Sequence, residues 1–578
     1  MQNREIAAAL DEIADLLEFQ DANPFRVRAY RNAARRATDH PRSLAAIVAE
    51  GGSLTQIDGI GKDLAEKIAT LIATGKLPML AELQAEVPSS VLTLLRIPGL
   101  GPKKAAALFK QLNIQSLDML RVACDEHRVR DLKGFGEKTE VLILAGIDLA
   151  AQAGKRIYWA DADAIVQELR AHLQGTPGLE QLEVAGSYRR GKETVGDLDL
   201  LVDAADHGPV MDRLAEYPGV KDTIARGETK MSVRLDSGLQ VDLRVVPKQS
   251  FGAALQYFTG SKDHNVILRG MAKDRGLKIN EWGVYRGDDE GKEQGPSFAG
   301  RTEEEVYRVM DLPCFPPEIR EAREEFEWAA AGKLPKLIEL ADIVGDLHMH
   351  TSATDGKNTI REMAAAAQTL GLKYIAITDH SKRVTMARGL NAERAREQWA
   401  EIERVNGELA GFRVLKGIEC DILESGAMDL PDAVLAEADW VVASLHYGQN
   451  QPRTQIMERL LGAIAHPSVN VIAHPTGRLI GRRDPYELDV DELIAAAANH
   501  GKMLELNCNP ARLDLDDIHC AAAKRHGVPI VMSTDAHSIG GLNTMRYGIL
   551  QARRAGLTKA DVANTRPWAK FAKLLPPK

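Results

Sequence analysis

Three aspartates in two strand-like segments have the chemistry to hold divalent cations. Asp197 and Asp199 lie two residues apart in the apolar run from 196 to 202, so both carboxylates emerge on one face of a strand. Asp242 lies in a second apolar segment, from 239 to 246, where an unpaired carboxylate would be costly. Three converging carboxylates favour two Mg²⁺ or Mn²⁺ ions, as in two-metal nucleotidyl transfer. An exposed pair of aspartates at a strand end is the simpler alternative.

A glycine-led turn precedes these aspartates. Its sequence is Gly186-Ser187-Tyr188-Arg189-Arg190-Gly191. The turn offers a hydroxyl and two guanidinium groups, which are suited to the oxygens of a triphosphate. This context strengthens the interpretation of the aspartates as a nucleotide-processing site.

A second set of possible ligands lies in the C-terminal part of the chain, where histidines and carboxylates follow apolar, strand-like segments. The set consists of His348, His350, Asp355, His380, Glu419, His446, His474, Asp535 and His537. In β/α barrels the carboxyl ends of the strands assemble the active site. Imidazole and carboxylate ligands without a thiolate suit zinc or manganese. A lone histidine at a strand end is more often a satisfied polar residue, but nine together predict a metal cluster.

Three Gly-x-Gly turns recur at near-regular spacing in the first part of the chain. Their key residues are Gly59 and Gly61, then Gly99, Gly101 and Lys103, then Gly134 and Gly136. Each precedes an apolar helical segment, where bare backbone amides favour phosphate oxygens. The turns resemble helix-hairpin-helix motifs, which bind the DNA backbone without reading its sequence. Plain loop turns are the alternative.

The elements that must position these residues follow from periodicity. Residues 1 to about 150 show short helical patterns, and strand-like runs then alternate with helices, as in an α+β domain. A proline-rich segment with a charged helix from Glu318 to Trp328 is the predicted connection to the next domain. From Gly345 onward, apolar strands alternate with alanine-rich helices, which predicts a β/α barrel-like domain.

Over roughly residues 1 to 315 the chain resembles DNA polymerase family X. The likeness rests on Gly186 to Asp199, the Asp242 strand, and Tyr257-Phe258-Thr259-Gly260-Ser261 with Asn265 and Arg269. It implies that Asp197, Asp199 and Asp242 are metal ligands and that Ser187, Arg190 and Gly196 hold the incoming triphosphate. It further implies that Tyr257, Phe258, Gly260, Asn265 and Arg269 shape the nucleotide pocket. Val195 replaces a triphosphate-binding serine of the vertebrate relative.

The same resemblance makes residues 1 to about 80 similar to the family's lyase domain. Lys67 falls at the position of the lysine that forms a Schiff base. Arg26 and Asp63 stand where the vertebrate enzyme has lysines that support phosphate binding. We therefore expect at most weak lyase chemistry, and a helix-surface lysine is the alternative.

From about residue 342 the chain resembles the polymerase and histidinol phosphatase (PHP) phosphoesterases. The likeness implies up to three Mn²⁺ or Zn²⁺ ions. The implied ligand sets are His348, His350, Glu419 and Asp535 for one ion, Glu419, His446 and His474 for a second, and Asp355, His380 and His537 for a third. Filled ligand positions favour an active hydrolase.

Together these resemblances predict a multidomain chain. The expected parts are a helical lyase-like DNA-binding domain (1–80), a helix-hairpin-helix domain (81–152), an α+β nucleotidyltransferase palm (153–247), a nucleotide-binding subdomain (248–317), a linker (318–341) and a PHP domain (342–578). This architecture implies a DNA polymerase that fills short gaps in base excision repair, with a 3′ to 5′ exonuclease. A 3′-phosphatase or abasic-site endonuclease activity is compatible with it. The alternatives are a nucleotidyltransferase for another acceptor fused to a small-molecule phosphatase, and a DNA-binding scaffold with idle sites.

Composition limits the partners and the location. The 578 residues carry a net charge of −9, so gapped or nicked DNA must be bound through local patches rather than by bulk charge. Deoxynucleoside triphosphates are the other expected substrates. Five scattered cysteines, no signal peptide and no membrane-spanning apolar run indicate a cytoplasmic protein without membrane contact, and we expect a monomer.

Overall fold

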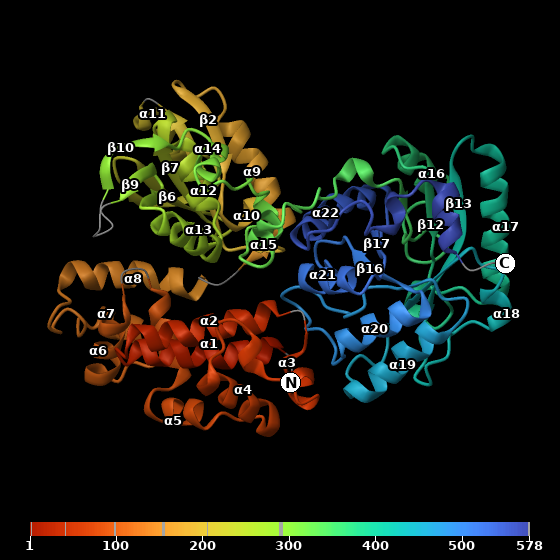
Figure 1. The fold of residues 1–578 in the computed structure, drawn as a ribbon, viewed down its shortest axis with the longest axis horizontal. Coiled ribbons are helices and arrows are strands. Elements are labelled where there is room, and N and C mark those ends of the chain that lie inside the picture. The colour runs from red at the N-terminus through yellow and green to blue at the C-terminus, as the bar shows by residue number, and fades with distance from the viewer. Residues whose placement is uncertain are drawn as a thin grey trace. The chain divides into compact units, whose positions relative to one another are not determined.

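The computed structural model describes residues 1, 3–40, 42–97, 100–152, 156–204, 206–287 and 293–575. Within it the chain divides into two compact units, Met1–Lys155 and Arg156–Lys578. The first is coloured red to orange in Figure 1. Among the described residues, no helix is both long enough and apolar enough to cross a lipid bilayer. Gly99, which belongs to the second glycine turn, lies outside the described residues.

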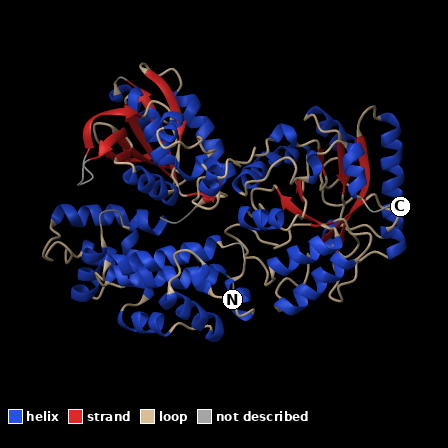
Figure 2. Ribbon diagram, viewed as in Figure 1, coloured by secondary structure: helices blue, strands red, loops and turns tan. Residues whose placement is uncertain are grey.

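The described residues of the first unit form helices and connecting loops, without a strand (Figure 2). Its helices are α1 (Asn3–Phe19), α2 (Pro24–Asp39), α3 (Leu44–Ala49), α4 (Lys62–Thr74), α5 (Pro78–Glu86), α6 (Pro102–Leu112), α7 (Leu117–Asp125) and α8 (Glu137–Gln152), with 3₁₀ turns at Leu54–Gln56 and Ser89–Arg96. In α1 the helically spaced Ile6, Leu10 and Ile13 are fully buried. The predicted helical organisation is confirmed here.

The glycine turns open helices as the sequence indicates. Gly61 and Gly101 are the residues that cap α4 and α6, and Gly136 directly precedes α8. Gly59 and Gly134 have φ angles of 83° and 90°, a left-handed conformation that residues with a Cβ atom rarely adopt. The turns therefore present the amino ends of three helices.

The second unit begins with an open five-stranded sheet in the order β2-β4-β7-β6-β5. Its strands are β2 (Leu179–Val184), β4 (Asp197–Ala204), β5 (Val220–Arg226), β6 (Lys230–Leu235) and β7 (Gln240–Val246). Helices α9 (Trp159–Leu173), α10 (Gly186–Arg189) and α11 (His207–Ala215) accompany it, and β1 (Ile157–Tyr158) pairs with β3 (Thr194–Val195). The predicted α+β domain is confirmed. Strand β5 was not predicted, because its exposed edge position lacks an apolar pattern.

A mixed helical and β segment follows the sheet. It contains α12 (Phe251–Thr259), α13 (Lys262–Asp274), α14 (Glu303–Arg308) and a three-stranded sheet of β8 (Leu277–Asn280), β9 (Gly283–Gly287) and β10 (Glu293–Ala299).

The charged helix predicted from Glu318 to Trp328 is only partly present. Pro317–Ile319 form a 3₁₀ turn, and α15 runs from Glu325 to Ala330. Between them Ala322 has a left-handed φ of 56°, which interrupts a helix. The Arg320 guanidinium is buried and donates to the Phe315 carbonyl oxygen, so tertiary contacts determine the local backbone.

The rest of the unit is a parallel barrel. Seven strands lie side by side in chain order: β11 (Gly345–Asp346), β12 (Tyr374–Ile377), β13 (Arg413–Asp421), β14 (Trp440–Ser444), β15 (Val471–Ile472), β16 (Met503–Asn507) and β17 (Ile530–Ser533). Just beyond β11 and β17, Met349 and Ala536 form a parallel bridge that nearly closes the sheet. The predicted β/α barrel-like domain is confirmed.

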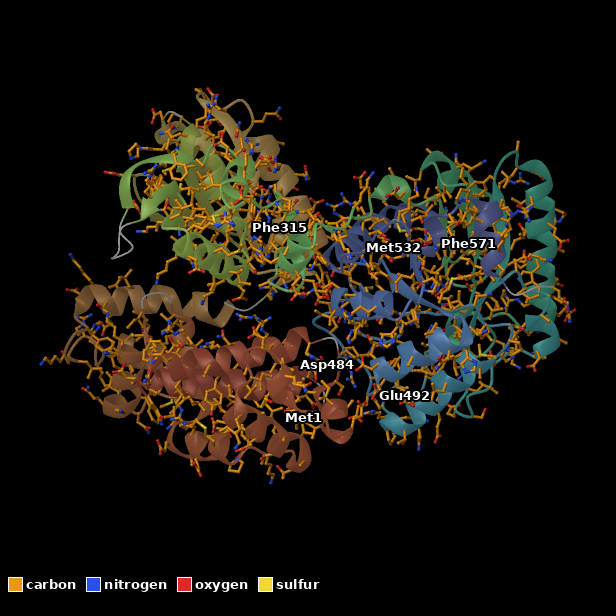
Figure 3. The ribbon with its side chains drawn as sticks, in the orientation of Figure 1. Met1, Phe315, Asp484, Glu492, Met532 and Phe571 are labelled. Atoms are coloured by element: carbon orange, nitrogen blue, oxygen red, sulfur yellow. The ribbon has the colours of Figure 1, made fainter. Side chains whose placement is uncertain are left out.

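Amphipathic helices accompany the barrel strands, and their apolar faces join its core. They are α16 (Ile360–Thr369), α17 (Ala392–Glu408), α18 (Asp432–Leu435), α19 (Arg453–Ala465), α20 (Val490–His500), α21 (Asp517–Arg525), α22 (Met545–Arg554) and α23 (Trp568–Phe571). Met532 on β17 and Phe571 on α23 are both fully buried and are labelled in Figure 3. This packed scaffold fixes the strand ends where the candidate ligands lie.

Candidate metal centres

Strand pairing places the three palm aspartates on one side of the sheet, but among the described residues they do not form a group whose donor atoms all lie within 4.8 Å of one another. Strands β4 and β7 are parallel neighbours, and Asp199 is the direct register partner of Asp242. Asp197 lies two residues before Asp199 on the same face of β4, whereas Leu198 and Leu200 are buried in the core on the other face. The alternation predicted from the sequence therefore places all three carboxylates on one side of the sheet.

The carboxylates repel one another. Burial, together with the negative charges of Asp197 and Asp242, raises the pKa of Asp199 to about 6. Burial alone would raise the pKa of Asp242, but hydrogen bonds from Ser232, Lys230 and Gln240 outweigh it and lower that pKa. Lys230 Nζ lies 2.9 Å from Asp242 Oδ2. Arg156 and Arg244 also act on these carboxylates, yet the pKa values of Asp197 and Asp199 stay raised. A set of three such carboxylates fits divalent cations.

The glycine turn approaches the aspartates closely. Gly186 has a φ of 65°, and a Cβ atom there would lie 2.7 Å from Asp199 Oδ2, so only glycine fits. Ser187 is half-buried on α10. Arg190 donates from Nε to Glu321 Oε1 at 3.1 Å. At Gly196 a Cβ atom would lie 3.2 Å from Arg156 Nη1.

The predicted nucleotide-pocket residues form one connected group. Asn265 donates from Nδ2 to the Tyr257 carbonyl oxygen at 2.8 Å, and Arg269 Nε donates to the Asn265 carbonyl oxygen at 3.2 Å. Phe258 stacks under the Arg244 guanidinium, 4.2 Å from the ring centroid. Arg244 follows Asp242 by two residues on β7, so the group adjoins the aspartates.

Gly260 ends the helix that carries the two aromatic rings. Its φ is 69°, and a Cβ atom there would lie 3.3 Å from Arg190 Nη1. The same nitrogen of Arg190 donates to the Thr259 carbonyl oxygen at 2.5 Å. The glycine turn of the palm and the end of α12 are therefore in direct contact.

The second centre gathers side chains from the carboxyl ends of barrel strands. His348 and His350 follow β11, His380 follows β12 and Glu419 lies on β13. His446, His474, Asp535 and His537 follow the later strands, and Asp355 lies in the loop after β11. The structure thus brings together all nine residues predicted from the sequence.

Glu419 faces two groups of histidines. Its Oε2 lies 3.5 Å from Nε2 of both His348 and His350. Its Oε1 lies 3.1 Å from His474 Nε2 and 3.4 Å from His446 Nε2. A carboxylate with ligand groups at each oxygen has the geometry to bridge two cations.

The remaining ligands form a third group beside these. Asp355 Oδ2 lies 3.3 Å from Nε2 of both His380 and His537. Among the described residues, three sets have donor atoms within 4.8 Å of one another: His350, Asp355, His380 and His537; His348, His350 and Asp535; and His380, Glu419 and His446. These sets overlap with the predicted ones but divide the ligands differently, because His350 and His380 each reach two groups.

Among the described residues, several buried atoms of this cluster have no hydrogen-bond partner, which makes the cluster suitable for cations. They include Nε2 of His348, both ring nitrogens of His350 and Oε2 of Glu419. Buried polar atoms normally form hydrogen bonds, so several buried atoms without such bonds at one place indicate an ion site. His474 and Asp535 also adopt left-handed φ angles of 29° and 53°. Such backbone conformations in non-glycine residues concentrate at functional sites.

Two supporting carboxylates were missed by the sequence analysis. Glu505 on β16 lies 2.7 Å from His348 Nδ1 and accepts a hydrogen bond from the His474 backbone at 2.6 Å. Asp421 on β13 lies 3.1 Å from His446 Nδ1. Such partners orient a histidine so that its other nitrogen faces the metal. The available signal was a carboxylate in a strand of the same series, in the middle of β16 for Glu505 and at the last residue of β13 for Asp421.

Lys67 on α4 is held by its neighbours. Its Nζ forms an ion pair with Asp63, one helical turn earlier, and lies 5.8 Å from the centroid of the Tyr30 ring. Burial alone would lower the pKa of Lys67, but hydrogen bonds to Asp63 and Tyr30 raise it above its ordinary value. Arg26 contacts Met79 at 3.7 Å rather than Lys67. A lysine held in the charged form is a poor nucleophile.

We predict that Glu505→Ala weakens binding of Mn²⁺ or Zn²⁺ by the barrel cluster. Loss of a carboxylate that orients a metal-binding histidine costs roughly 10- to 100-fold in metal affinity. Metal content after dialysis and a Mn²⁺ titration measure the change. Glu458→Ala, at an exposed position on α19, is the matched control and should bind metal normally. Unchanged affinity in Glu505→Ala would show that Glu505 does not support the ligands.

Five family models match successive parts of the chain. They are a helix-hairpin-helix domain (residues 1–77), a SAM-like helix-hairpin-helix tandem (91–148), the DNA polymerase beta palm (156–227), the DNA polymerase beta thumb (254–321) and the PHP domain (346–509). Both helix-hairpin-helix matches and both polymerase matches agree with the family expected from the sequence.

Curated relatives match the whole chain or part of it. The Bacillus subtilis protein named DNA polymerase/3′-5′ exonuclease PolX is 43% identical over 569 residues, which cover 98% of each chain. A probable phosphatase of Thermoanaerobacter sp. is 30% identical over 39% of this chain and 91% of its own. Another, of Acetivibrio thermocellus, is 31% identical over 34% of this chain and 79% of its own. The chain therefore belongs to the PolX family, the family X DNA polymerases that carry a C-terminal PHP domain.

Proposed function

We propose that the chain is a DNA-dependent DNA polymerase that fills short gaps during base excision repair. The observation that carries this proposal is the register of β4 and β7, which sets Asp199 opposite Asp242 beside a glycine turn with a hydroxyl and arginines. Family membership supports the same conclusion. Primer extension on a short gapped duplex, with and without Mg²⁺ or Mn²⁺, tests the proposal directly.

Each palm residue has a proposed role. Asp197, Asp199 and Asp242 would hold Mg²⁺ or Mn²⁺, which would neutralise the negative charge of the reacting oxygens. Ser187, Arg190 and Gly196 hold the triphosphate of the incoming nucleotide. The pocket for its sugar and base, and for the primer-template, is assigned to Tyr257, Phe258, Gly260, Asn265 and Arg269.

The glycine turns of the first unit are the proposed contacts to the DNA backbone. Gly59, Gly61, Gly101, Gly134 and Gly136 lie at or before the amino ends of helices, where unpaired amides suit phosphate oxygens. Lys103 lies 3.3 Å from Asp21 and is largely exposed, so it remains accessible to a phosphate group. Gapped or nicked DNA is the proposed partner, and the monomeric state and cytoplasmic location stay predictions.

A 3′ to 5′ exonuclease is the proposed activity of the barrel. Its support is the convergence of nine candidate ligands, several with buried atoms that lack hydrogen-bond partners among the described residues, and the name of the Bacillus subtilis relative. Mn²⁺ or Zn²⁺ bound there would provide hydroxide at neutral pH and would hold a phosphodiester. Glu505 and Asp421 orient His348 and His446 in this scheme.

A 3′-phosphatase is the second candidate activity of the same site. The partial likeness of the chain to two probable phosphatases favours it. A nucleotidyltransferase with another acceptor is less consistent with the helix-hairpin-helix matches. An idle scaffold is less consistent with buried ligand atoms that lack partners, since such atoms are costly without a function.

We expect Asp242→Ala to reduce gap filling by at least roughly a hundredfold, because it removes a ligand that neutralises charge at the reacting oxygens. The exonuclease should keep its rate, since its ligands lie on the barrel. Both activities are measured on the same preparation, with the exposed Asp236→Ala as the control. Loss of both activities in a folded protein would show that the two centres are not separate.

Glu419→Ala should reduce exonuclease activity more than Asp355→Ala. Glu419 contacts candidate ligands through both carboxylate oxygens, whereas Asp355 contacts one group of histidines. Removal of Glu419 should therefore disturb two ions, and removal of Asp355 only one. Exonuclease rate and metal content are measured together across a Mn²⁺ titration. Gap filling should survive in both variants. A full metal complement and wild-type nuclease rate in Glu419→Ala would reject the bridging role.

Lys67 should give little borohydride-trapped Schiff base on an incised abasic site at neutral pH. Its raised pKa keeps the amine protonated. Asp63→Asn should lower that pKa towards its ordinary value, increase the neutral fraction at any given pH and strengthen trapping. Asp58→Asn, which affects an ion pair with Arg36 instead, is the control. Equally strong trapping in wild type and Lys67→Ala would reject this lysine as the nucleophile.

A further inference from the structure

The glycine turn proposed to hold the triphosphate rests on a helix of the barrel. Helix α22 carries Gln551, whose Nε2 donates to the Gly191 carbonyl oxygen at 2.9 Å, and Arg554, whose Nη1 donates to the Arg190 carbonyl oxygen at 2.9 Å. Gly191 has a φ of 63°, and a Cβ atom there would lie 3.0 Å from Leu550. The backbone of the turn is therefore packed directly against the barrel.

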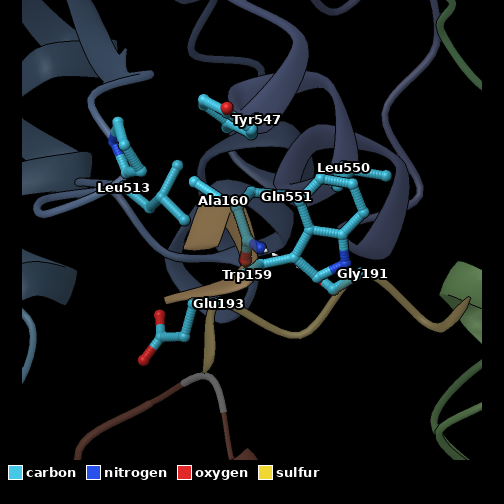
Figure 4. A pocket seen from close by; sticks show the side chains of 9 residues that line it. Trp159, Ala160, Gly191, Glu193, Leu513, Tyr547, Leu550 and Gln551 are labelled. Carbon is cyan, nitrogen blue, oxygen red and sulfur yellow. Dashed lines mark hydrogen bonds between the residues drawn. The ribbon is translucent and has the colours of Figure 1, made fainter. Parts of the chain in front are cut away.

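Close packing continues beside the turn. The cavity at this junction has a volume of only ≈ 10 Å³, room for about one water molecule. Figure 4 shows Trp159 and Glu193 of the palm opposite Tyr547, Leu550 and Gln551 of the barrel helix. A cavity of this size does not accommodate a small-molecule ligand. The junction therefore acts through the contacts by which α22 fixes the glycine turn.

Glu321 joins the side chains of the two domains. Its Oε1 lies 3.1 Å from Arg190 Nε, 2.8 Å from Arg554 Nη1 and 3.5 Å from Lys192 Nζ. The Glu321 side chain is 10% exposed. Burial alone would raise its pKa, but Arg554, Lys192 and Arg190 hold that pKa well below its ordinary value. Glu321 is therefore ionised, and its Oε1 forms ion pairs with both Arg190 and Arg554.

Arg554 is itself fixed on the barrel side. Its side chain is 1% exposed, and its Nη2 lies 2.8 Å from Asp517 Oδ2 on α21. Helix α22 packs its Ile549 and Ala552 in the barrel core. Moving Arg554 away from Glu321 would remove a short, buried ion pair and the hydrogen bond within it, which is unfavourable. The position of Glu321 is thereby determined by the barrel.

Arg190 is held so that part of its guanidinium remains available. Nε is taken by Glu321 and Nη1 by the Thr259 carbonyl oxygen. Among the described residues, its third nitrogen, Nη2, has no hydrogen-bond partner. A guanidinium fixed at two nitrogens loses little freedom when the third binds an anion.

We infer that Glu321 is a positioning residue that aims Arg190 at the triphosphate, and that Arg554 of the barrel holds Glu321 in place. The inference rests on the proposed triphosphate role of Arg190. It makes nucleotide affinity at the palm depend on a side chain of the barrel. The dependence acts through three residues in direct contact.

Steady-state gap filling measures the KM for a deoxynucleoside triphosphate and kcat in Glu321→Gln and Arg554→Lys. Each should raise KM about tenfold, the effect of losing one hydrogen bond to a charged group, and should leave kcat within about twofold. A merely structural defect would lower the active fraction, and hence kcat, without raising KM. Glu321→Asp, which keeps the charge, should restore much of the affinity. Glu324→Gln, at an exposed pair with Arg525, is the matched control and should behave as wild type.

A double variant identifies the route. If Glu321 acts through Arg190, then Arg190→Lys with Glu321→Gln should have the same KM as Arg190→Lys alone. Additive increases, or a wild-type KM in Glu321→Gln, would overturn the inference. A wild-type KM in Arg190→Lys would instead reject the triphosphate role on which it rests. Thermal unfolding of each variant identifies those that misfold. If Glu321→Gln misfolds, the KM of Arg554→Lys, which retains the positive charge, tests the inference.

Discussion

Buried carboxylates need positive charge nearby, and this constraint organises three separate places in the second unit. In the palm, Asp199 lies opposite Asp242, with Lys230 in contact with Asp242 and the positive charge of Arg244 acting on Asp199. In the barrel, Glu419 is surrounded by imidazoles, and among the described residues several of their nitrogens have no hydrogen-bond partner. At the junction, Glu321 is matched by arginines from both sides. Only the junction is satisfied by the chain itself, whereas the other two have the composition of ion sites.

Parallel strand pairing positions the candidate ligands in both centres. Between β4 and β7 it sets two aspartates in register, and in the barrel it brings the carboxyl ends of seven strands to one rim. Side chains from residues 348 to 537 then meet without long excursions of the chain. Supporting carboxylates such as Glu505 lie on the same strands, so the fold that gathers the ligands also orients them.

Local sequence patterns predicted the main candidate residues of both centres, but not the residues that support them or the contacts between distant segments. Aspartates spaced two apart and polar residues at strand ends are local signals, so the nine barrel residues and the palm aspartates could be selected as candidate ligands. Glu505 and Asp421 lie within strands and resemble any polar residue there. The helix expected from Glu318 was disrupted by the buried Arg320, a tertiary effect. The contact between Glu321 and Arg554 joins residues 233 positions apart, and no local pattern predicts it.

Strand β5 forms one edge of the palm sheet and carries exposed, charged side chains. It pairs with β6 on one side, and Lys221, Asp222 and Arg226 are exposed along it. A strand from another molecule that added there would have to bring its backbone against these charges and strip them of water. The β5 edge is thereby protected from the strand-to-strand growth through which exposed edges aggregate.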